Sequence, residues 1–205
     1  MKKLFTLLAL TITFSMNAQM SDNSSGTSAI GTYAVAMGYS TTASGYASTA
    51  MGVVTTASGS RSTAMGYATT ASGSLSTAMG QSTVASGNYS TAIGNYSIAS
   101  GSRSTAMGSG TTASGDYSTA MGGGTTASDF VSVVIGQFNS SGSSATSANS
   151  FSTSAPAFVI GNGAAYNAKS DAFKVMFNGD ATVSNDLTVS GDVVISSDAR
   201  LKSNI

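Results

Sequence analysis

Serine and threonine hydroxyls are the most numerous side-chain groups of this chain that take part in nucleophilic chemistry. A hydroxyl becomes a useful nucleophile when an adjacent base, most often histidine, takes its proton. The chain has no His, no Cys and no Glu, so it contains neither that base nor a thiol nucleophile. The composition therefore predicts a protein that is not an enzyme acting on an external substrate.

The same composition argues against a metal, a cofactor or a nucleic-acid partner. Soft metal sites need Cys or His, and calcium sites need clustered carboxylates. The central region offers only Asp116 and Asp129, and a disulfide framework is impossible without Cys. Formal net charge is zero, and no run of Lys and Arg forms a basic stripe for phosphates. We therefore expect no metal site, no cofactor and no nucleic-acid binding.

The first residues have the composition of a secretory signal peptide. Lys2 and Lys3 give a positive start, residues 4–14 are apolar, and Ala18 is a small residue before a plausible cleavage site at Gln19. The apolar run is too short to anchor the chain across a bilayer, although a buried helix of a cytosolic protein has similar features. We predict that residues 1–18 direct export, that the protein is secreted or held at a bacterial cell surface, and that this chain carries no membrane anchor.

A repeat of seven residues runs through the middle of the chain and must fix the positions of all its side chains. Gly recurs at every seventh position from Gly31 to Gly122, and Ala stands two residues before each position of this register from Ala29 to Ala127. Such strict spacing separates the chain from disordered sequences of similar composition, and it is typical of stacked coils. A helix is disfavoured because each internal Gly costs it about 0.5–1 kcal/mol.

Within each half-repeat, alternate residues differ sharply in size. In the segment 48–52, Ser48, Ala50 and Gly52 form one tiny face, whereas Thr49 and Met51 form the other. Side chains of a strand alternate between two faces, so the tiny face suits the inside of a narrow coil made of two strands. The pattern predicts an all-β solenoid over residues 29–136.

The residue before Gly alternates between apolar and Ser, which makes the true period twice the seven-residue spacing. At about 4.8 Å per turn, eight turns form a rod of about 38 Å. The apolar positions form one outward row, whose apolar area exceeds that of the patches that soluble monomers normally expose. We expect this row to be covered by identical chains; metal binding and membrane contact fit less well, since no companion ligands or flanking Lys and Arg accompany the thioethers. The row consists of Met37, Met51, Met65, Met79, Ile93, Met107, Met121 and Ile135.

The repeat resembles that of the heads of trimeric autotransporter adhesins, the YadA-like heads. Residues 62–73, Ser-Thr-Ala-Met-Gly followed by Tyr-Ala-Thr-Thr-Ala-Ser-Gly, follow the family pattern Ser-Val-Ala-Ile-Gly-x-x-Ser-x-Ala-x-Gly, with Thr for Val and Met for Ile. The likeness extends over about residues 27–136. It implies a left-handed parallel β-roll, a homotrimer packed along its apolar strands, and adhesion at the cell surface.

Other segments flank the repeats. Residues 19–28 are expected to form an N-terminal cap, 137–157 a Ser-rich linker or neck, and 158–196 a β-stalk with a six-residue period, which we expect to be an intertwined trimer.

Residues 197–205 resemble the opening of the endosialidase-type intramolecular chaperone. That resemblance implies self-cleavage at Ser197, activated by Lys202; alternatively, Ser197 occupies an ordinary turn position of the stalk.

Ligand contacts are expected in the variable pair after each Gly, where Tyr and Arg favour recognition; the same residues also suit plain corners of the coil. The candidates for a host or matrix ligand are Tyr46, Arg61, Leu75, Tyr89, Arg103 and Tyr117.

Two alternative functions remain. Outward Thr and Ser, such as Thr56 and Ser58, form a lattice suited to ice binding, interrupted at Val84 and Ile98, and the C-terminal nonapeptide favours a phage-type tail fibre.

Overall fold

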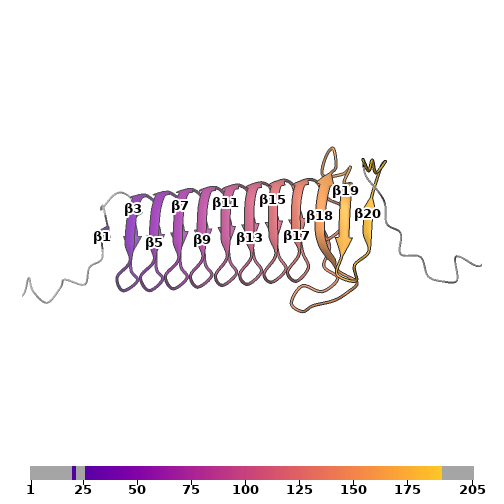
Figure 1. Ribbon diagram of the computed structural model, residues 1–205. Coiled ribbons are helices and arrows are strands. Elements are labelled where there is room, and N and C mark those ends of the chain that lie inside the picture. Colours follow the sequence, from indigo (N-terminus) through magenta and orange to yellow (C-terminus); the bar gives the residue numbers. More distant parts are fainter. Residues whose placement is uncertain (1–19, 22–25, 191–205) are drawn as a thin grey trace, which may run out of the picture.

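The computed structural model describes residues 20–21 and 26–190, and these residues form strands and turns without any helix. The predicted signal peptide (1–18) and the segment with Ser197 and Lys202 lie outside the described residues. Two sheets run along the molecule (Figure 1). The long sheet contains β1 (Met20–Ser21), β3 (Val35–Tyr39), β5 (Thr49–Val53), β7 (Thr63–Tyr67), β9 (Thr77–Gln81), β11 (Thr91–Asn95), β13 (Thr105–Ser109), β15 (Thr119–Gly123), β17 (Val133–Gln137), β18 (Pro156–Asn162), β19 (Asp171–Met176) and β20 (Ala181–Val183).

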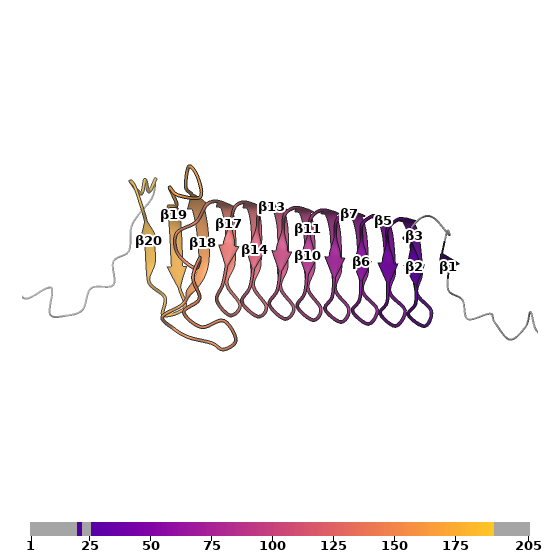
Figure 2. The ribbon, with the colours of Figure 1, turned by 180° about the vertical axis from the view of Figure 1, so that it is seen from behind.

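The short sheet lies behind the long one and consists of two-residue strands (Figure 2). Its strands are β2 (Ser28–Ala29), β4 (Thr42–Ala43), β6 (Thr56–Ala57), β8 (Thr70–Ala71), β10 (Val84–Ala85), β12 (Ile98–Ala99), β14 (Thr112–Ala113) and β16 (Thr126–Ala127). From β2 to β17 the chain alternates between the two sheets, so that each pair of strands makes one turn of a coil.

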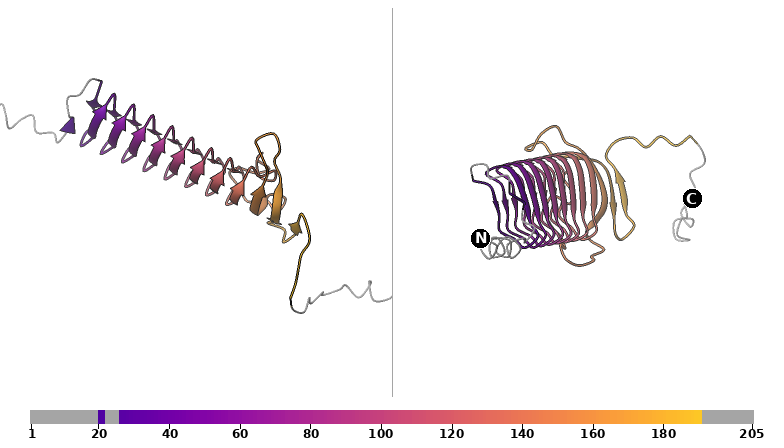
Figure 3. Two further views of the ribbon diagram at one scale, coloured as in Figure 1. Left: turned by 90° about the horizontal axis from the view of Figure 1, so that it is seen from above. Right: turned by 90° about the vertical axis from the view of Figure 1, so that its left-hand side faces the viewer.

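Successive coils stack in parallel with a constant offset of one full turn. In the long sheet Ala50 pairs with Ala64 and Met51 with Met65, and in the short sheet Thr56 pairs with Thr70. Viewed from the end of the rod, the coils lie one behind another, each shifted slightly from the last (Figure 3). The prediction of an all-β parallel solenoid with about eight turns, each made of two of the seven-residue repeats, is confirmed.

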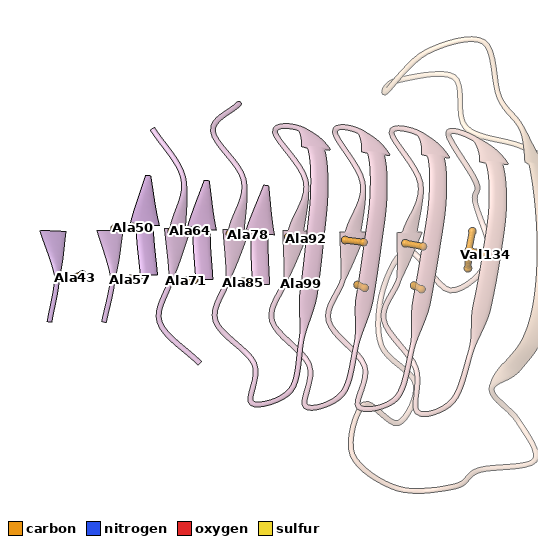
Figure 4. Close-up of a cluster of buried hydrophobic side chains, with 14 of the residues drawn as sticks. Ala43, Ala50, Ala57, Ala64, Ala71, Ala78, Ala85, Ala92, Ala99 and Val134 are labelled. Carbon is orange, nitrogen blue, oxygen red and sulfur yellow. The ribbon is translucent and has the colours of Figure 1, made fainter. Parts of the chain in front are cut away.

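The apolar part of the core consists almost entirely of alanine. Two columns of Ala side chains, one from each sheet, face each other between the sheets and are fully buried (Figure 4). Ala50 and Ala57 are typical members, and Val134 takes the equivalent position in the last regular coil. Because interiors pack at crystal-like density, the methyl groups set the narrow separation of the two sheets. The tiny face recognised in the sequence is therefore the inside of the coil, as predicted.

Glycine is required where the backbones of adjacent coils come closest. Gly52 has a φ of 123°, and a methyl group on it would overlap the carbonyl oxygen of Gly66 in the next coil. On the opposite side of the coil, a methyl group on Gly59 would overlap the carbonyl oxygen of Gly73. A side chain at either position would collide with backbone, which cannot move without opening the stack.

Two further columns of hydroxyl groups lie inside the coil beside the alanines. One column contains Thr69 and Thr111, the other Ser62 and Ser104, and all are nearly or fully buried. Thr111 donates to Ser97 Oγ at 2.9 Å, and Ser104 donates to the carbonyl of Gly101 at 2.7 Å. Thr69 Oγ1 and Ser62 Oγ have no hydrogen-bond partner. The core is thus half polar and incompletely hydrogen-bonded.

Each coil also turns through a residue with left-handed backbone. In the turn 45–48, Ala47 has a φ of 51°, and the N–H of Ser48 donates to the carbonyl of Gly45 at 3.2 Å. The N–H of Ala47 donates to Thr32 of the preceding coil at 2.8 Å. Even Val54 and Val131 adopt this conformation, which costs an L-residue about 1–2 kcal/mol. Repeated hydrogen bonds between coils hold these turns in place.

The regular repeat ends at a cap formed by residues 138–155. Asp129 replaces the expected Gly, is fully buried, and accepts hydrogen bonds from the N–H groups of Thr146 and Ser147 at 2.6 and 2.7 Å. Asp171 accepts from the N–H groups of Ser140 and Ser141. Two aspartates therefore fasten this segment, for which the sequence predicts a linker or neck, to the end of the solenoid.

β18 continues the long sheet beyond the cap instead of starting a separate element. Val134 pairs with Val159 and Gly136 with Gly161, in parallel as before. β19 then pairs antiparallel with β18, and β20 antiparallel with β19, through a turn at Gly179. β20 and the chain that follows it to Ser190 are exposed along their whole length.

Candidate binding surfaces

The apolar row stands on the outer face of the long sheet. Met51, Met65 and Met79 follow one another in register from coil to coil, and each is half-buried by its neighbours along the row. Met37, Met107 and Met121 are 39%, 40% and 37% exposed. The Met side chains lie outside the coil because the interior is filled by small side chains, almost all of them Ala, Ser, Thr and Gly. The structure thus assembles all eight predicted residues into one stripe.

The candidate ligand residues gather along one edge of the rod, in the turns that precede the long strands. Tyr46, Arg61, Leu75, Tyr89, Arg103 and Tyr117 are all exposed there, one per coil, and we call this series the tyrosine–arginine edge. The Arg61 guanidinium lies 5.5 Å from the Tyr46 ring centre. Arg103 lies between two rings, 5.1 Å from Tyr89 and 5.1 Å from Tyr117. These distances are within the range of cation–π interactions.

Two aromatic residues extend this edge beyond the predicted set. Tyr33 contacts Tyr46 edge-to-face with ring centres 5.6 Å apart, and Phe130 contacts Tyr117 in the same manner at 5.5 Å. Both occupy the variable pair of their coils. Tyr33 stands two residues after Gly31, so the glycine register is enough to find it. Phe130 comes directly after Asp129, which replaces the Gly of the register, so the same signal is missing there. The edge is therefore aromatic at both of its ends.

The outer face of the short sheet carries Thr and Ser, as expected for a polar strand. Thr56 and Thr70 are partly exposed and pair in register, as do Thr112 and Thr126. Val84 and Ile98 stand in the same column and break it in the middle. The face is consequently two short hydroxyl arrays separated by an apolar patch.

Within the described residues, no group of three or more His, Cys, Asp or Glu side chains could hold a metal ion. An open pocket beside the cap is lined by hydroxyl side chains, Pro156, Lys174 and Met176. In the part of the chain that the structure describes, no helix is long and apolar enough to cross a membrane.

Coil length, parallel register and a core of small side chains define the class of this protein: a parallel β-solenoid in which two short strands make each turn. A scan against protein-family models matches the YadA head domain repeat at residues 29–55, 43–69, 57–74, 71–97 and 99–125. The repeat region of this chain is a YadA-like head, as its sequence resemblance indicates. A search of the curated proteins found no match to the chain.

Proposed function

We propose that this protein is the head of a secreted, non-enzymatic trimeric fibre that attaches a bacterial cell to a surface. The proposal rests mainly on the outward row of Met and Ile, which a single coil cannot bury. Heads with this repeat are trimeric, non-enzymatic adhesins of bacterial cell surfaces, which supports the same function for residues 29–125. The signal-peptide features of residues 1–18 support export.

Burial of the row supplies the free energy for assembly. A Met or Ile side chain gains about 1.5–3 kcal/mol when it moves from water to an apolar environment. Each side chain of the row is already partly covered by its neighbours in the stack, so only part of that value is available. Three identical stripes that meet around an axis parallel to the rod cover one another, and cyclic symmetry makes their contacts equivalent.

Sedimentation of the mature chain tests this proposal. The wild-type protein is expected to sediment as a trimer, and Met79→Asp is expected to dissociate it because the charge would be buried in the interface. Ser72→Asp introduces the same charge on the outer face of the short sheet and serves as the control, with the trimer retained. A wild-type chain that remains monomeric at all concentrations contradicts the proposal.

Ice binding is a second candidate, favoured by the in-register threonines of the short sheet. The column repeats at about 4.8 Å, which gives a regular array of hydroxyl groups. Val84 and Ile98 limit this array to short pieces, and for that reason we prefer adhesion. A freezing-point gap between ice growth and melting, lost in Thr70→Val and Thr56→Val, is the result that selects ice binding instead.

A further inference from the structure

Positive charge on the solenoid is confined to one edge. Arg61 and Arg103 are the only Lys or Arg residues between residues 29 and 136, and both belong to the tyrosine–arginine edge. They lie three coils apart, about 14 Å at the spacing of stacked strands. The outer faces of both sheets within these repeats carry no cationic side chain. Any electrostatic attraction of an anion to the repeats is therefore directed to this edge.

Neither guanidinium forms an ion pair with any residue that the structure describes. Arg61 lies over one aromatic ring, and Arg103 lies between two. Asp116 precedes Tyr117 on the same edge, and its Oδ1 accepts a hydrogen bond from the backbone N–H of Ser102 at 2.8 Å. Stacking on a ring fixes the plane of a guanidinium while its N–H groups remain available to an anion.

Main-chain N–H groups of this edge are engaged between coils. The N–H of Arg61 donates to the carbonyl of Tyr46, and that of Arg103 donates to the carbonyl of Asn88, each at 2.7 Å. The N–H of Tyr117 donates to the carbonyl of Ser102 at 2.7 Å. Because these hydrogen bonds between coils occupy the N–H groups of both arginines, their contacts with a ligand come from the guanidinium groups.

We propose that the tyrosine–arginine edge binds a linear acidic polysaccharide, with sugar rings against the tyrosines and sulfate or carboxylate groups on the two arginines. This inference rests on the proposed adhesive function and specifies its ligand. A sugar ring presents an apolar face that packs on an aromatic ring, and Arg forms two parallel hydrogen bonds with a planar or tetrahedral anion. The ladder of one side chain per coil matches a chain of successive sugar units.

Two arginines per chain favour a glycan over nucleic acid. Nucleic-acid binding depends on many phosphate contacts and on a continuous basic surface. Here the cations are separated by Leu75 and Tyr89, which contribute packing surface without charge. A ligand with widely spaced anionic groups and apolar ring faces in between has the complementary pattern.

Binding of heparin, a linear sulfated polysaccharide, to the immobilised mature protein tests the proposal. The double variant Arg61→Gln/Arg103→Gln is expected to bind at least about tenfold more weakly, since each lost pair is a charge-assisted interaction. Lys169→Gln is the matched control, because Lys169 also lies over a tyrosine, 4.9 Å from the Tyr166 ring, but outside the edge. Its binding should stay within about twofold of wild type.

Further measurements separate the geometry of the guanidinium from its charge, and heparin from other polymers. Arg61→Lys/Arg103→Lys keeps the charge but loses the planar fork, and is expected to recover only a minor part of the affinity. Neutral dextran should not bind. Equal binding of heparin by wild type and the Arg→Gln variant, or equal binding of duplex DNA and heparin, overturns the glycan assignment. If cells that display the protein still adhere in either case, the adhesive function itself stands.

Discussion

At the scale of single residues, glycine decides whether the coils can stack at all. A methyl group on Gly66, whose φ is 122°, would overlap the carbonyl oxygen of Gly80. Gly66→Ala therefore combines backbone strain with a collision that no side-chain movement relieves. We expect the free energy of unfolding to fall by more than about 4 kcal/mol, a loss that single substitutions reach only when they disrupt the structure directly. Urea denaturation followed by circular dichroism measures it.

Gly123→Ala is the control for that prediction. Gly123 lies in β15, on the same kind of long strand, but an added methyl group would meet only Gln137 Cβ at 3.9 Å, an ordinary contact. Its unfolding free energy should change by less than about 0.5 kcal/mol. If the two variants lose stability equally, close stacking of the backbones is not the reason for the glycine register.

In the buried hydroxyl columns, the same substitution is expected to change stability in opposite directions at two equivalent positions. Thr69 Oγ1 is buried without a partner, so Thr69→Val removes an uncompensated polar group and should stabilise the protein by about 1 kcal/mol. Thr111→Val removes the hydrogen bond to Ser97 and should destabilise it by about 1 kcal/mol. Thermal unfolding of both variants checks the sign, and changes in the same direction contradict the distinction.

At this scale the sequence predicts the inside of the coil better than its corners. Ala50 and Gly52 could be assigned from size and spacing, because alternation alone decides which residues face inward. The left-handed backbone of Val54 or Leu75 carries no such signal, since these side chains usually avoid it. Hydrogen bonds from the neighbouring coils impose that conformation, and they exist only once the stack has formed.

At the scale of elements, the cap depends on two aspartates that accept backbone hydrogen bonds. Asp129→Ala leaves the N–H groups of Thr146 and Ser147 without an acceptor. We expect hydrogen exchange of these two amides to accelerate by at least about tenfold, because a lost charge-assisted hydrogen bond exceeds about 1.4 kcal/mol. Exchange in the central strands, for example at Met65, should be unchanged.

Asp180→Ala provides the comparison for the cap variant. Asp180 is exposed and accepts a hydrogen bond from the side-chain amide of Asn178 within the β19–β20 turn, away from the cap. Its replacement should leave the amides of Thr146 and Ser147 as protected as in the wild-type protein. Unchanged protection in Asp129→Ala would mean that the cap is held by other contacts.

The cap also explains why the sequence predicts a C-terminal part separate from the solenoid. Coil partners are one full turn apart in the sequence up to the pair Thr119 and Val133, whereas the partner of Val133 is Phe158, nearly two turns' length further along the chain. The cap interrupts the spacing, so the periodic pattern is lost although the sheet continues. Gly136 and Gly161 stay in register across the interruption, a relation that only the three-dimensional pairing reveals.

At the scale of the whole molecule, three candidate surfaces lie on three sides of one thin rod. The Met row lies on the long sheet, the tyrosine–arginine edge lies in the adjoining turns, and the hydroxyl arrays lie on the short sheet. Because each coil contributes one residue to every side, extra coils would lengthen all three surfaces equally. The proposed assembly uses the first of these sides, and the proposed ligand uses the second.

Thermal stability offers a final prediction about assembly that does not depend on detecting the trimer directly. If unfolding is coupled to dissociation, Tm of the wild-type chain rises with protein concentration. Met65→Thr/Met79→Thr introduces the residue that the adjacent column already carries at Thr63 and Thr77, so a single coil should tolerate it. The variant is expected to have a lower Tm that varies less with concentration, as measured by scanning calorimetry.

Val84→Thr is the control on the opposite face. It introduces the same residue into the short sheet, where it continues the column of Thr70, and should leave both Tm and its concentration dependence near the wild-type values. A Tm that is independent of concentration in the wild-type chain, and equal in the two-Met variant, would remove the physical basis for assembly. The exposed thioethers would then need a partner other than this chain, because a core of alanines has no space to receive them.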